Sequence, residues 1–369
     1  MNILVTGGAG FIGSHIVDRL VKDGHFVRIF DSLEPQVHKS FPEYLNKDAE
    51  FVKADVRNAS ALETALDDID TIFHEAALVG VGQSMYQIDR YVDINTGGTA
   101  KLLNLLVNKD HDVKKLIVAS SMSIYGEGSY KCEDCGIVYP SVRSDIQFKK
   151  HDWEMRCPNC DKHVVPIPTN EEKPLQPTSI YAITKKDQEE LSLAVGRAYG
   201  IPVVALRYFN TYGPRQALSN PYTGVCAIFS SRIKNDKPPI IFEDGMQGRD
   251  FVSVHDIAEA NILVMSKASA NYNVYNVGTG RPTTILEISE LLSQLYGKKF
   301  KPNIVNEFRA GDIRHCYADV SRIKKLGFKS SIPINVGIKE LVEWGKIQAA
   351  DDYSEKAYSE LKERGLLEE

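Results

Sequence analysis

The chain opens with Met1-Asn2-Ile3-Leu4-Val5-Thr6-Gly7-Gly8-Ala9-Gly10-Phe11-Ile12-Gly13-Ser14-His15, and this stretch decides the fold. Its apolar run at residues 3–5 is typical of a strand buried on both faces. Glycines follow directly, and apolar residues then recur at helical spacing. Glycine lets a backbone approach a pyrophosphate, and a helix N-terminus favours its negative charge. The stretch therefore predicts a strand, a turn and a helix that bind a dinucleotide through Gly7, Gly10, Phe11, Ile12 and Gly13.

Asp31 indicates which dinucleotide binds. It ends the next predicted strand, residues 26–30. Its carboxylate would hydrogen-bond both hydroxyls of an adenosine ribose and repel a 2′-phosphate, so we expect NAD rather than NADP. Arg28 would weaken this preference if it reached the ribose, but alternation along the strand points it away.

Short β-like runs alternate with helical patterns as far as Arg207. These runs are residues 51–55, 71–74, 116–120 and 203–207. The alternation predicts an α/β fold, a Rossmann-type doubly wound parallel sheet with helices on both faces. Sites in such sheets form at the carboxyl ends of strands, where four residues of interest fall: Asp31, Asp55, Ala76 and Ser121.

Composition excludes several classes of protein. The chain has 369 residues, of which 25% are charged and 43% hydrophobic, and its net charge is −5. A negative chain does not favour nucleic acid as a partner. No apolar stretch is long enough to cross a bilayer, and Met1 leads directly into a strand rather than a signal peptide. We expect a cytoplasmic protein with two lobes and no membrane partner.

Two CxxC pairs interrupt the α/β rhythm, within an insertion at residues 129–166. They are Cys132 with Cys135 and Cys157 with Cys160. This spacing predicts a zinc-ribbon-like site for one Zn²⁺, and four thiolates leave no open position, so the metal would be structural. Disulfides are the alternative, but they fit a reducing compartment poorly.

Tyr181 and Lys185 form the strongest catalytic signal. On a helix, their spacing of four places both side chains on one face. A phenol beside an ammonium group can lose its proton below its usual pKa of about 10, which makes Tyr181 a candidate general base. Ser121 ends a strand upstream of this pair.

The chain divides into three parts. Residues 1–206 form the expected NAD-binding Rossmann domain, which contains the insertion. Residues 207–349 mainly form a smaller substrate-binding lobe, with some segments returning to the first domain. The strongly charged tail, residues 350–369, has apolar residues at loose helical spacing, so we expect a marginal surface helix with no assignable role.

Several motifs occur in a characteristic order. They are residues 6–13, Asp55-Val56-Arg57, His74-Glu75-Ala76-Ala77, residues 95–99, Ser120-Ser121, residues 181–185, residues 207–214, Gly248-Arg249-Asp250-Phe251-Val252 and Arg309-Ala310-Gly311-Asp312. With them the chain resembles the extended short-chain dehydrogenase/reductase superfamily, and most of all its NAD-dependent nucleotide-sugar epimerases and dehydratases. The resemblance covers roughly residues 1 to 345, apart from the cysteine-bearing insertion.

The resemblance implies a role for each site residue. Tyr181 would accept a proton from the sugar hydroxyl, Lys185 would hold the nicotinamide ribose, and Ser121 would hydrogen-bond the reacting hydroxyl. The remaining cofactor residues would flank the adenine or support the cofactor channel: Asp55, Val56, Ala76, Ala77 and Asn95.

The substrate would be a nucleotide-diphosphate sugar. The resemblance implies that Asn210, Arg249 and Arg309 contact its diphosphate, beside Ser121 and Ser123 at the sugar. Ion pairs are the alternative for the arginines: Arg249 with Asp250 or Asp256, and Arg309 with Asp312. The resemblance also implies a homodimer.

The two residues after Ser121 separate the possible reactions. Dehydratases of this family have Thr-Asp-Glu here, whereas this chain has Ser121-Met122-Ser123, which lacks the carboxylates for acid–base work at C5 and C6. This favours 4-epimerisation through a 4-keto sugar on a dTDP-6-deoxyhexose, such as dTDP-L-rhamnose, or on a UDP-hexose. A dehydratase, a keto-sugar reductase and a non-catalytic zinc-ribbon interaction protein remain as alternatives.

Overall fold

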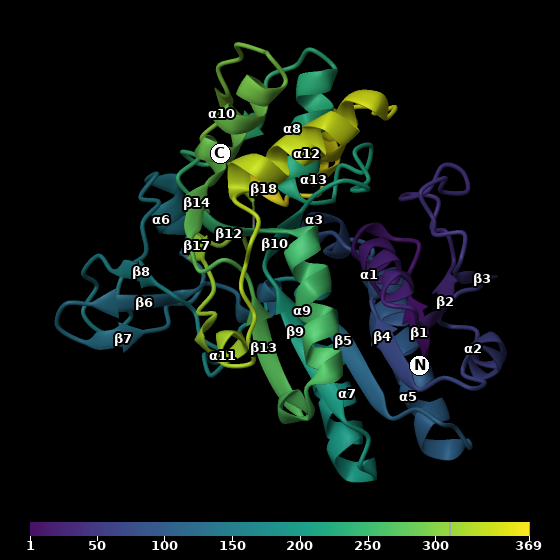
Figure 1. Ribbon diagram of the computed structural model, residues 1–369. Coiled ribbons are helices and arrows are strands. Elements are labelled where there is room, and N and C mark those ends of the chain that lie inside the picture. The colour runs from purple at the N-terminus through teal and green to yellow at the C-terminus, as the bar shows by residue number, and fades with distance from the viewer. Residues whose placement is uncertain (310, 369) are drawn as a thin grey trace.

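A seven-stranded parallel sheet forms the centre of the computed structural model, which describes residues 1–309 and 311–368 (Figure 1). Its strand order is β13-β9-β5-β4-β1-β2-β3. The strands are β1 (Asn2–Thr6), β2 (Phe26–Asp31), β3 (Glu50–Lys53), β4 (Thr71–His74), β5 (Lys115–Ser121), β9 (Val203–Tyr208) and β13 (Asn273–Val277). The chain winds outward in both directions from β1, so the carboxyl ends of β1 and β4 border a crevice. The predicted doubly wound sheet is confirmed.

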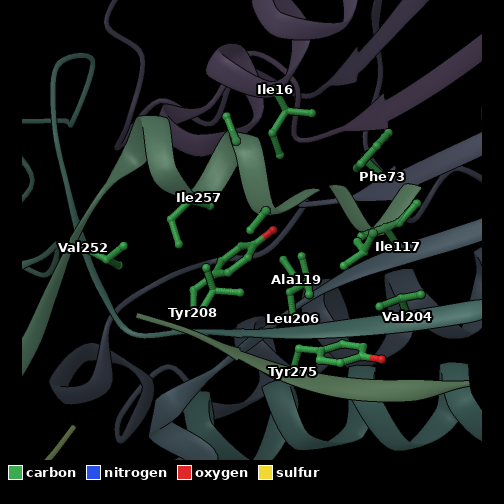
Figure 2. Close-up of a cluster of buried hydrophobic side chains, with 14 of the residues drawn as sticks. Ile16, Phe73, Ile117, Ala119, Val204, Leu206, Tyr208, Val252, Ile257 and Tyr275 are labelled. Carbon is green, nitrogen blue, oxygen red and sulfur yellow. The ribbon is translucent and has the colours of Figure 1, made fainter. Parts of the chain in front are cut away.

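Helices cover both faces of this sheet. On one face lie α1 (Phe11–Lys22), α9 (Val254–Ser266) and α11 (Ser321–Lys324); on the other lie α2 (Ala59–Ala65), α5 (Gly98–Asn108) and α7 (Ile180–Tyr199). Figure 2 shows the first face, where Ile16 of α1 and Ile257 of α9 point toward Phe73, Ile117 and Leu206 of the strands. Continuous apolar strands fit a sheet that is buried on both sides.

A smaller lobe lies over the carboxyl ends of the strands (Figure 1). Its helices are α8 (Val225–Lys234), α10 (Ile285–Leu295), α12 (Ile334–Ile347) and α13 (Ser354–Glu363). Its strands are β10 (Asn210–Tyr212), β11 (Ile240–Ile241), β12 (Gly248–Ser253), β14 (Pro282–Thr284), β15 (Asn303–Ile304), β16 (Phe308–Arg309), β17 (His315–Cys316) and β18 (Leu367–Glu368). The lobe has its own core, which includes Tyr212, Phe229, Leu292 and Leu341. Three segments from beyond residue 206, α9, β13 and α11, lie in the layers of the large sheet.

The insertion forms a separate antiparallel sheet in the order β7 (Gly136–Val138), β6 (Ser129–Cys132) and β8 (Val165–Ile167), and α6 (Asp145–Lys149) lies between β7 and β8 along the chain. Figure 1 shows it projecting from the molecule on the side away from β1 and β2. Its core is small and includes two of the cysteines, Cys132 and Cys157. Two short helices, α3 (Val81–Ser84) and α4 (Ile88–Tyr91), and a π-helical turn, Val92–Gly97, precede α5. Across the described residues, every helix is too short or too polar to cross a membrane.

Candidate active site

A cavity of about 620 Å³ lies between the sheet and the lobe. It is lined by nearly all the residues that the sequence predicted for cofactor and substrate: Gly7, Gly10, Phe11, Ile12, Gly13, Asp31, Asp55, Val56, Ala76, Ala77, Ser121, Ser123, Tyr181, Lys185, Asn210, Arg249 and Arg309. Residues from five strand ends and from the lobe therefore meet at one place.

The glycine-rich turn is too tight for larger residues. Gly7 has a φ of 69°, and a Cβ there would lie 2.7 Å from the backbone nitrogen of Ala76. A Cβ on Gly13 would lie 2.3 Å from the carbonyl oxygen of Gly7. The turn thus brings bare backbone and the N-terminus of α1 to the cavity, as pyrophosphate binding requires.

Asp31 holds this turn from the neighbouring strand. Its two carboxylate oxygens accept hydrogen bonds from the backbone nitrogens of Ala9, at 3.0 Å, and Leu33, at 2.8 Å. Arg28 instead donates to the carboxylate of Glu50 at 2.9 Å and lies outside the cavity lining. Asp31 therefore faces the cavity without an ion pair to Arg28.

Asn95 does not line the cavity, so it lies in the supporting position rather than the lining position expected for it. Its buried amide holds the backbone of Leu78 through two hydrogen bonds, at 2.7 and 3.1 Å, and donates to the hydroxyl of Thr184 at 3.0 Å. Asn95 thus fixes the loop after β4 against α7. The motif was informative, but its asparagine acts one layer behind the cavity.

Ser121, Tyr181 and Lys185 meet on one wall. Ser179 caps α7 by accepting a hydrogen bond from the backbone of Ala182 at 3.1 Å, which sets Tyr181 in the first turn. Ser121 hydrogen-bonds the phenol of Tyr181. The ammonium group of Lys185, one turn further on, donates to the side-chain oxygen of Gln188 at 2.8 Å.

The pKa of Tyr181 differs from the sequence prediction. Burial raises the pKa of the phenol, and the hydrogen bond from Ser121 only partly offsets this rise. Burial also lowers the pKa of Lys185 to about 8, against the raising effect of Glu75 and Glu189. Because burial disfavours both charged forms, proximity alone does not produce a tyrosinate in this structure.

Glu75 is a half-buried carboxyl that sequence reasoning did not select. It lines the cavity and accepts a hydrogen bond from the hydroxyl of Tyr208 at 2.9 Å. Burial raises its pKa, and the charge of Lys185 lowers it. The sequence signal that could have identified Glu75 was its position next to Ala76 in the motif His74-Glu75-Ala76-Ala77.

Arg249 is oriented toward the cavity by backbone rather than by a carboxylate. Its guanidinium donates to the carbonyl oxygens of Ile313, at 2.7 Å, and Arg314, at 2.8 Å. Neither of the ion pairs weighed for it forms, because Asp250 and Asp256 are occupied elsewhere, with residues 279–280 and 330–332. A cation held only by neutral carbonyls retains its charge for an anionic ligand.

Arg309 forms the ion pair that was its alternative role. Its Nε donates to Asp312 at 2.8 Å, and the guanidinium lies 4.8 Å from the ring centroid of Phe242. The residue nevertheless lines the cavity and is partly exposed.

Three buried amide oxygens in the cavity wall lack a hydrogen-bond partner within the described protein. They belong to Asn210, Gln216 and Gln247. A buried acceptor without a partner is costly, so these oxygens mark the lobe side of the cavity as a place for ligand donors. Sequence reasoning selected Asn210 and missed the two glutamines, which flank the predicted motifs.

The four cysteines of the insertion converge. Their sulfur atoms all lie within 4.8 Å of one another, and the sulfurs of Cys132 and Cys160 are 3.5 Å apart. All four are free thiols. Tetrahedral Zn²⁺ with Zn–S bonds of about 2.3 Å needs sulfurs roughly 3.8 Å apart, so this donor set fits zinc.

The insertion contacts the lobe rather than the cavity. No residue of 129–166 is among those that line it. Instead Glu154 accepts hydrogen bonds from the guanidinium of Arg314 at 2.6 Å and from the imidazole of His315 at 3.1 Å. The other imidazole nitrogen of His315 accepts from the backbone of Gly248 at 2.9 Å. The insertion therefore supports the segments around Arg249.

Two residues of the C-terminal tail line the cavity, namely Ala357 and Leu361 of α13. Both are buried. The expectation of a marginal surface helix was therefore wrong, since α13 lies over the site.

Fold and site define a dinucleotide-dependent α/β enzyme in which a serine, a tyrosine and a lysine meet at one cavity wall. The chain belongs to the NAD dependent epimerase/dehydratase family, and its match to the model of this family covers residues 3–143 and 159–278. The gap between these ranges falls inside the cysteine-bearing insertion.

Individual relatives extend this match to most of the chain. The dTDP-L-rhamnose 4-epimerase of Burkholderia thailandensis is 36% identical over 347 residues, which are 93% of this chain and 94% of that protein. The crystal structure of the UDP-glucose 4-epimerase of Thermotoga maritima with UDP-glucose is similar with a TM-score of 0.75 and 33% identity, covering 93% of this chain and 98% of that one. The UDP-glucuronic acid 4-epimerase of Bacillus cereus, in complex with UDP-glucuronic acid and NAD, gives a TM-score of 0.77 at 27% identity, covering 94% and 99%.

Proposed function

We propose that this chain is an NAD-dependent nucleotide-sugar 4-epimerase. The observation that carries the proposal is one continuous cavity, which runs from the glycine-rich turn past Tyr181 to the arginine in the lobe, Arg249. A dinucleotide at one end and a diphosphate at the other would place a sugar between them, against the Ser121–Tyr181 wall.

The residues would divide the chemistry as follows. Ser121 and Tyr181 bind the C4 hydroxyl of the sugar, and Tyr181 accepts its proton. When bound, NAD supplies the hydride acceptor and the positive nicotinamide charge that favours the phenolate. Lys185 and Asp31 hold the two riboses of the cofactor, so that the reacting ring stays in place.

Inversion requires the sugar to turn while its nucleotide stays fixed. Arg249 provides such a fixed point, because backbone carbonyls hold its guanidinium in one orientation. With NAD bound, the hydride would return to the opposite face of the 4-keto sugar once the sugar has turned, and Tyr181 would return the proton. Met122 and Ser123 offer no carboxylate for a dehydration at C5 and C6, which favours epimerisation over the dehydratase alternative.

The cations of the cavity favour a neutral sugar. Among the described lining residues, the lysines and arginines are Lys185, Arg249 and Arg309. The first is assigned to the cofactor and the other two to the diphosphate, so no lysine or arginine of this lining remains for a uronic acid carboxylate. The apolar side chain of Leu361, which lines the same cavity, suits a 6-deoxy sugar. We therefore place dTDP-6-deoxyhexoses such as dTDP-L-rhamnose first and UDP-hexoses second.

The insertion would hold one structural zinc ion through Cys132, Cys135, Cys157 and Cys160.

A homodimer would form through exposed aliphatic side chains on neighbouring helical segments, which are Ile88, Val92, Ile183 and Leu191. Light scattering of the purified protein should give twice the mass of one chain, and Leu191→Glu should shift it toward one.

The activity test uses three substrates without added cofactor. Purified protein is incubated with dTDP-L-rhamnose, UDP-glucose and UDP-glucuronate, and the C4 configuration is followed by NMR. We expect epimerisation fastest with the first substrate and slowest with the last. Tyr181→Phe is the matched control, because it removes the proton acceptor and keeps the ring. Failure to epimerise any nucleotide sugar while NAD is bound would contradict the proposal.

A further inference from the structure

The last residues of the chain connect the two sides of the cavity. We name residues 351–368 the C-terminal segment; it contains α13 and β18. On the dinucleotide side, the carboxylate of Asp351 pairs with Lys39 in the loop after β2. On the same side, the hydroxyl of Tyr86 donates to Glu360 at 3.0 Å, and the guanidinium of Arg364 lies 4.2 Å from the Tyr86 ring centroid.

The segment is attached equally to the lobe. Asp352 pairs with Arg232 of α8 at 3.3 Å, and both side chains are almost fully buried. The hydroxyl of Tyr358 donates to Glu307 at 2.7 Å. Strand β18 then pairs with β16, which places Leu367 opposite Arg309. Contacts on both sides of the cleft hold the two parts of the enzyme in one relative position.

The inner face of α13 closes the catalytic end of the cavity. Ala357 and Leu361 line the cavity, and a methyl carbon of Leu361 would lie 3.2 Å from a Cβ placed on Gly82. Gly82 belongs to α3, whose Ser84 accepts a hydrogen bond from the backbone nitrogen of Tyr181 at 3.0 Å. Leu361 and the catalytic tyrosine therefore contact the same four-residue helix.

We propose that the C-terminal segment retains the oxidised sugar during the turnover of the 4-epimerase proposed above. In that reaction C4 loses a hydride to NAD and a proton to Tyr181, which gives a 4-keto sugar and NADH. The keto sugar must leave the wall, turn and return. If the keto sugar were released at that moment, the enzyme would keep NADH and have no keto sugar to accept its hydride. Each release would therefore inactivate one enzyme molecule. A wall made by Leu361 and tied to both lobes through Glu360 and Asp352 prevents this release.

The test compares the full chain with a truncation that ends at Ala350. During turnover of the accepted nucleotide sugar, absorbance of reduced nicotinamide and free keto sugar are measured together. The full chain should reach equilibrium with little NADH. The truncated enzyme should stop early, with at least several-fold more bound NADH and an equal amount of released keto sugar. Added 4-keto sugar should restore its NAD form.

Point variants keep the test valid if the truncation does not fold. Leu361→Ala opens the wall, and Glu360→Gln weakens the bond with Tyr86, so both should accumulate NADH with unchanged NAD content at the start. Ser359→Ala, on the exposed side of α13, is the matched control and should behave as the full chain does. Complete turnover without NADH in folded Leu361→Ala would overturn the proposal. Inactivity of the full chain would instead overturn the epimerase assignment.

Discussion

At the scale of single residues, Tyr181 has an environment that opposes its ionisation. Burial raises its pKa, and the hydrogen bond from Ser121 lowers it. Because the base is the deprotonated phenol, kcat/KM should increase with pH on the acidic side of this pKa. Ser121→Ala removes the lowering effect, so its profile should move to higher pH. Measurement of kcat/KM against pH for both proteins checks this, and an unmoved or acid-shifted profile would contradict it.

The substitution Tyr181→Phe tests the role of the same residue at a single pH. It should reduce kcat by roughly 10²–10⁴-fold, the usual contribution of a general acid–base group. Thermal unfolding and the content of bound NAD should not change, since the ring keeps its packing. Activity near that of the unmodified chain would exclude Tyr181 as the base.

Asp31 sets the preference between the two dinucleotides. Its carboxylate lies in the cavity with both oxygens already bonded to backbone nitrogens, so its orientation is fixed before any ligand binds. Calorimetry should show tighter binding of NAD than of NADP. Asp31→Ala should narrow that difference by about 1.5–3 kcal/mol, the value of hydrogen bonds to a charged group. Equal affinities in the unmodified chain would falsify the assignment.

Sequence could predict the residues that act through local geometry. The glycines, Asp31 and the Tyr181–Lys185 pair depend on their own strand, turn or helix, and the cavity includes all of them. Asn95 shows where this reasoning stops. Its motif was visible, but whether a buried amide faces a ligand or a neighbouring loop depends on packing between β4 and α7, which no local spacing encodes.

At the scale of elements, two segments have contacts that their sequence did not indicate: the cysteine-bearing insertion and the C-terminal tail. The insertion leaves β5 close to Ser121 along the chain, yet it docks on β17 through Glu154 and His315. The charged tail is polar on average, yet it buries Leu361 over the site. Both outcomes depend on partners more than a hundred residues away in sequence, and composition carries no information about them.

The insertion's contacts predict a coupling between zinc and substrate binding. Glu154→Gln removes a charge from the pair with Arg314, whose backbone carbonyl orients Arg249. KM for the nucleotide sugar should rise about tenfold, or ~1.4 kcal/mol, with NAD affinity unchanged. Cys157→Ser should cause the same loss, together with loss of one zinc per chain by elemental analysis. A matched change at Lys131, exposed on the same insertion, should have no effect.

At the scale of the whole molecule, the reaction should keep its hydride inside the enzyme. In heavy water, the 4-epimer should carry no deuterium at C4, because the hydride returns from the bound cofactor, and none at C3 or C5. Mass spectrometry and NMR of the product check both positions. A product lighter by one water, or deuterated at C5, would contradict this. It would mean that another carboxyl, such as Glu75, performs the acid–base chemistry at C5 for which Met122 and Ser123 lack a carboxylate.

The order of the elements along the chain has a consequence for folding during synthesis. β1 and the glycine-rich turn leave the ribosome well before β13 and α13, and N-terminal parts generally fold first. The strands around the glycine-rich turn can therefore assemble before Leu361 is added to the wall of the cavity. At that stage the cleft lacks one of its walls, so we expect a dinucleotide to meet less obstruction on its way in than in the complete fold.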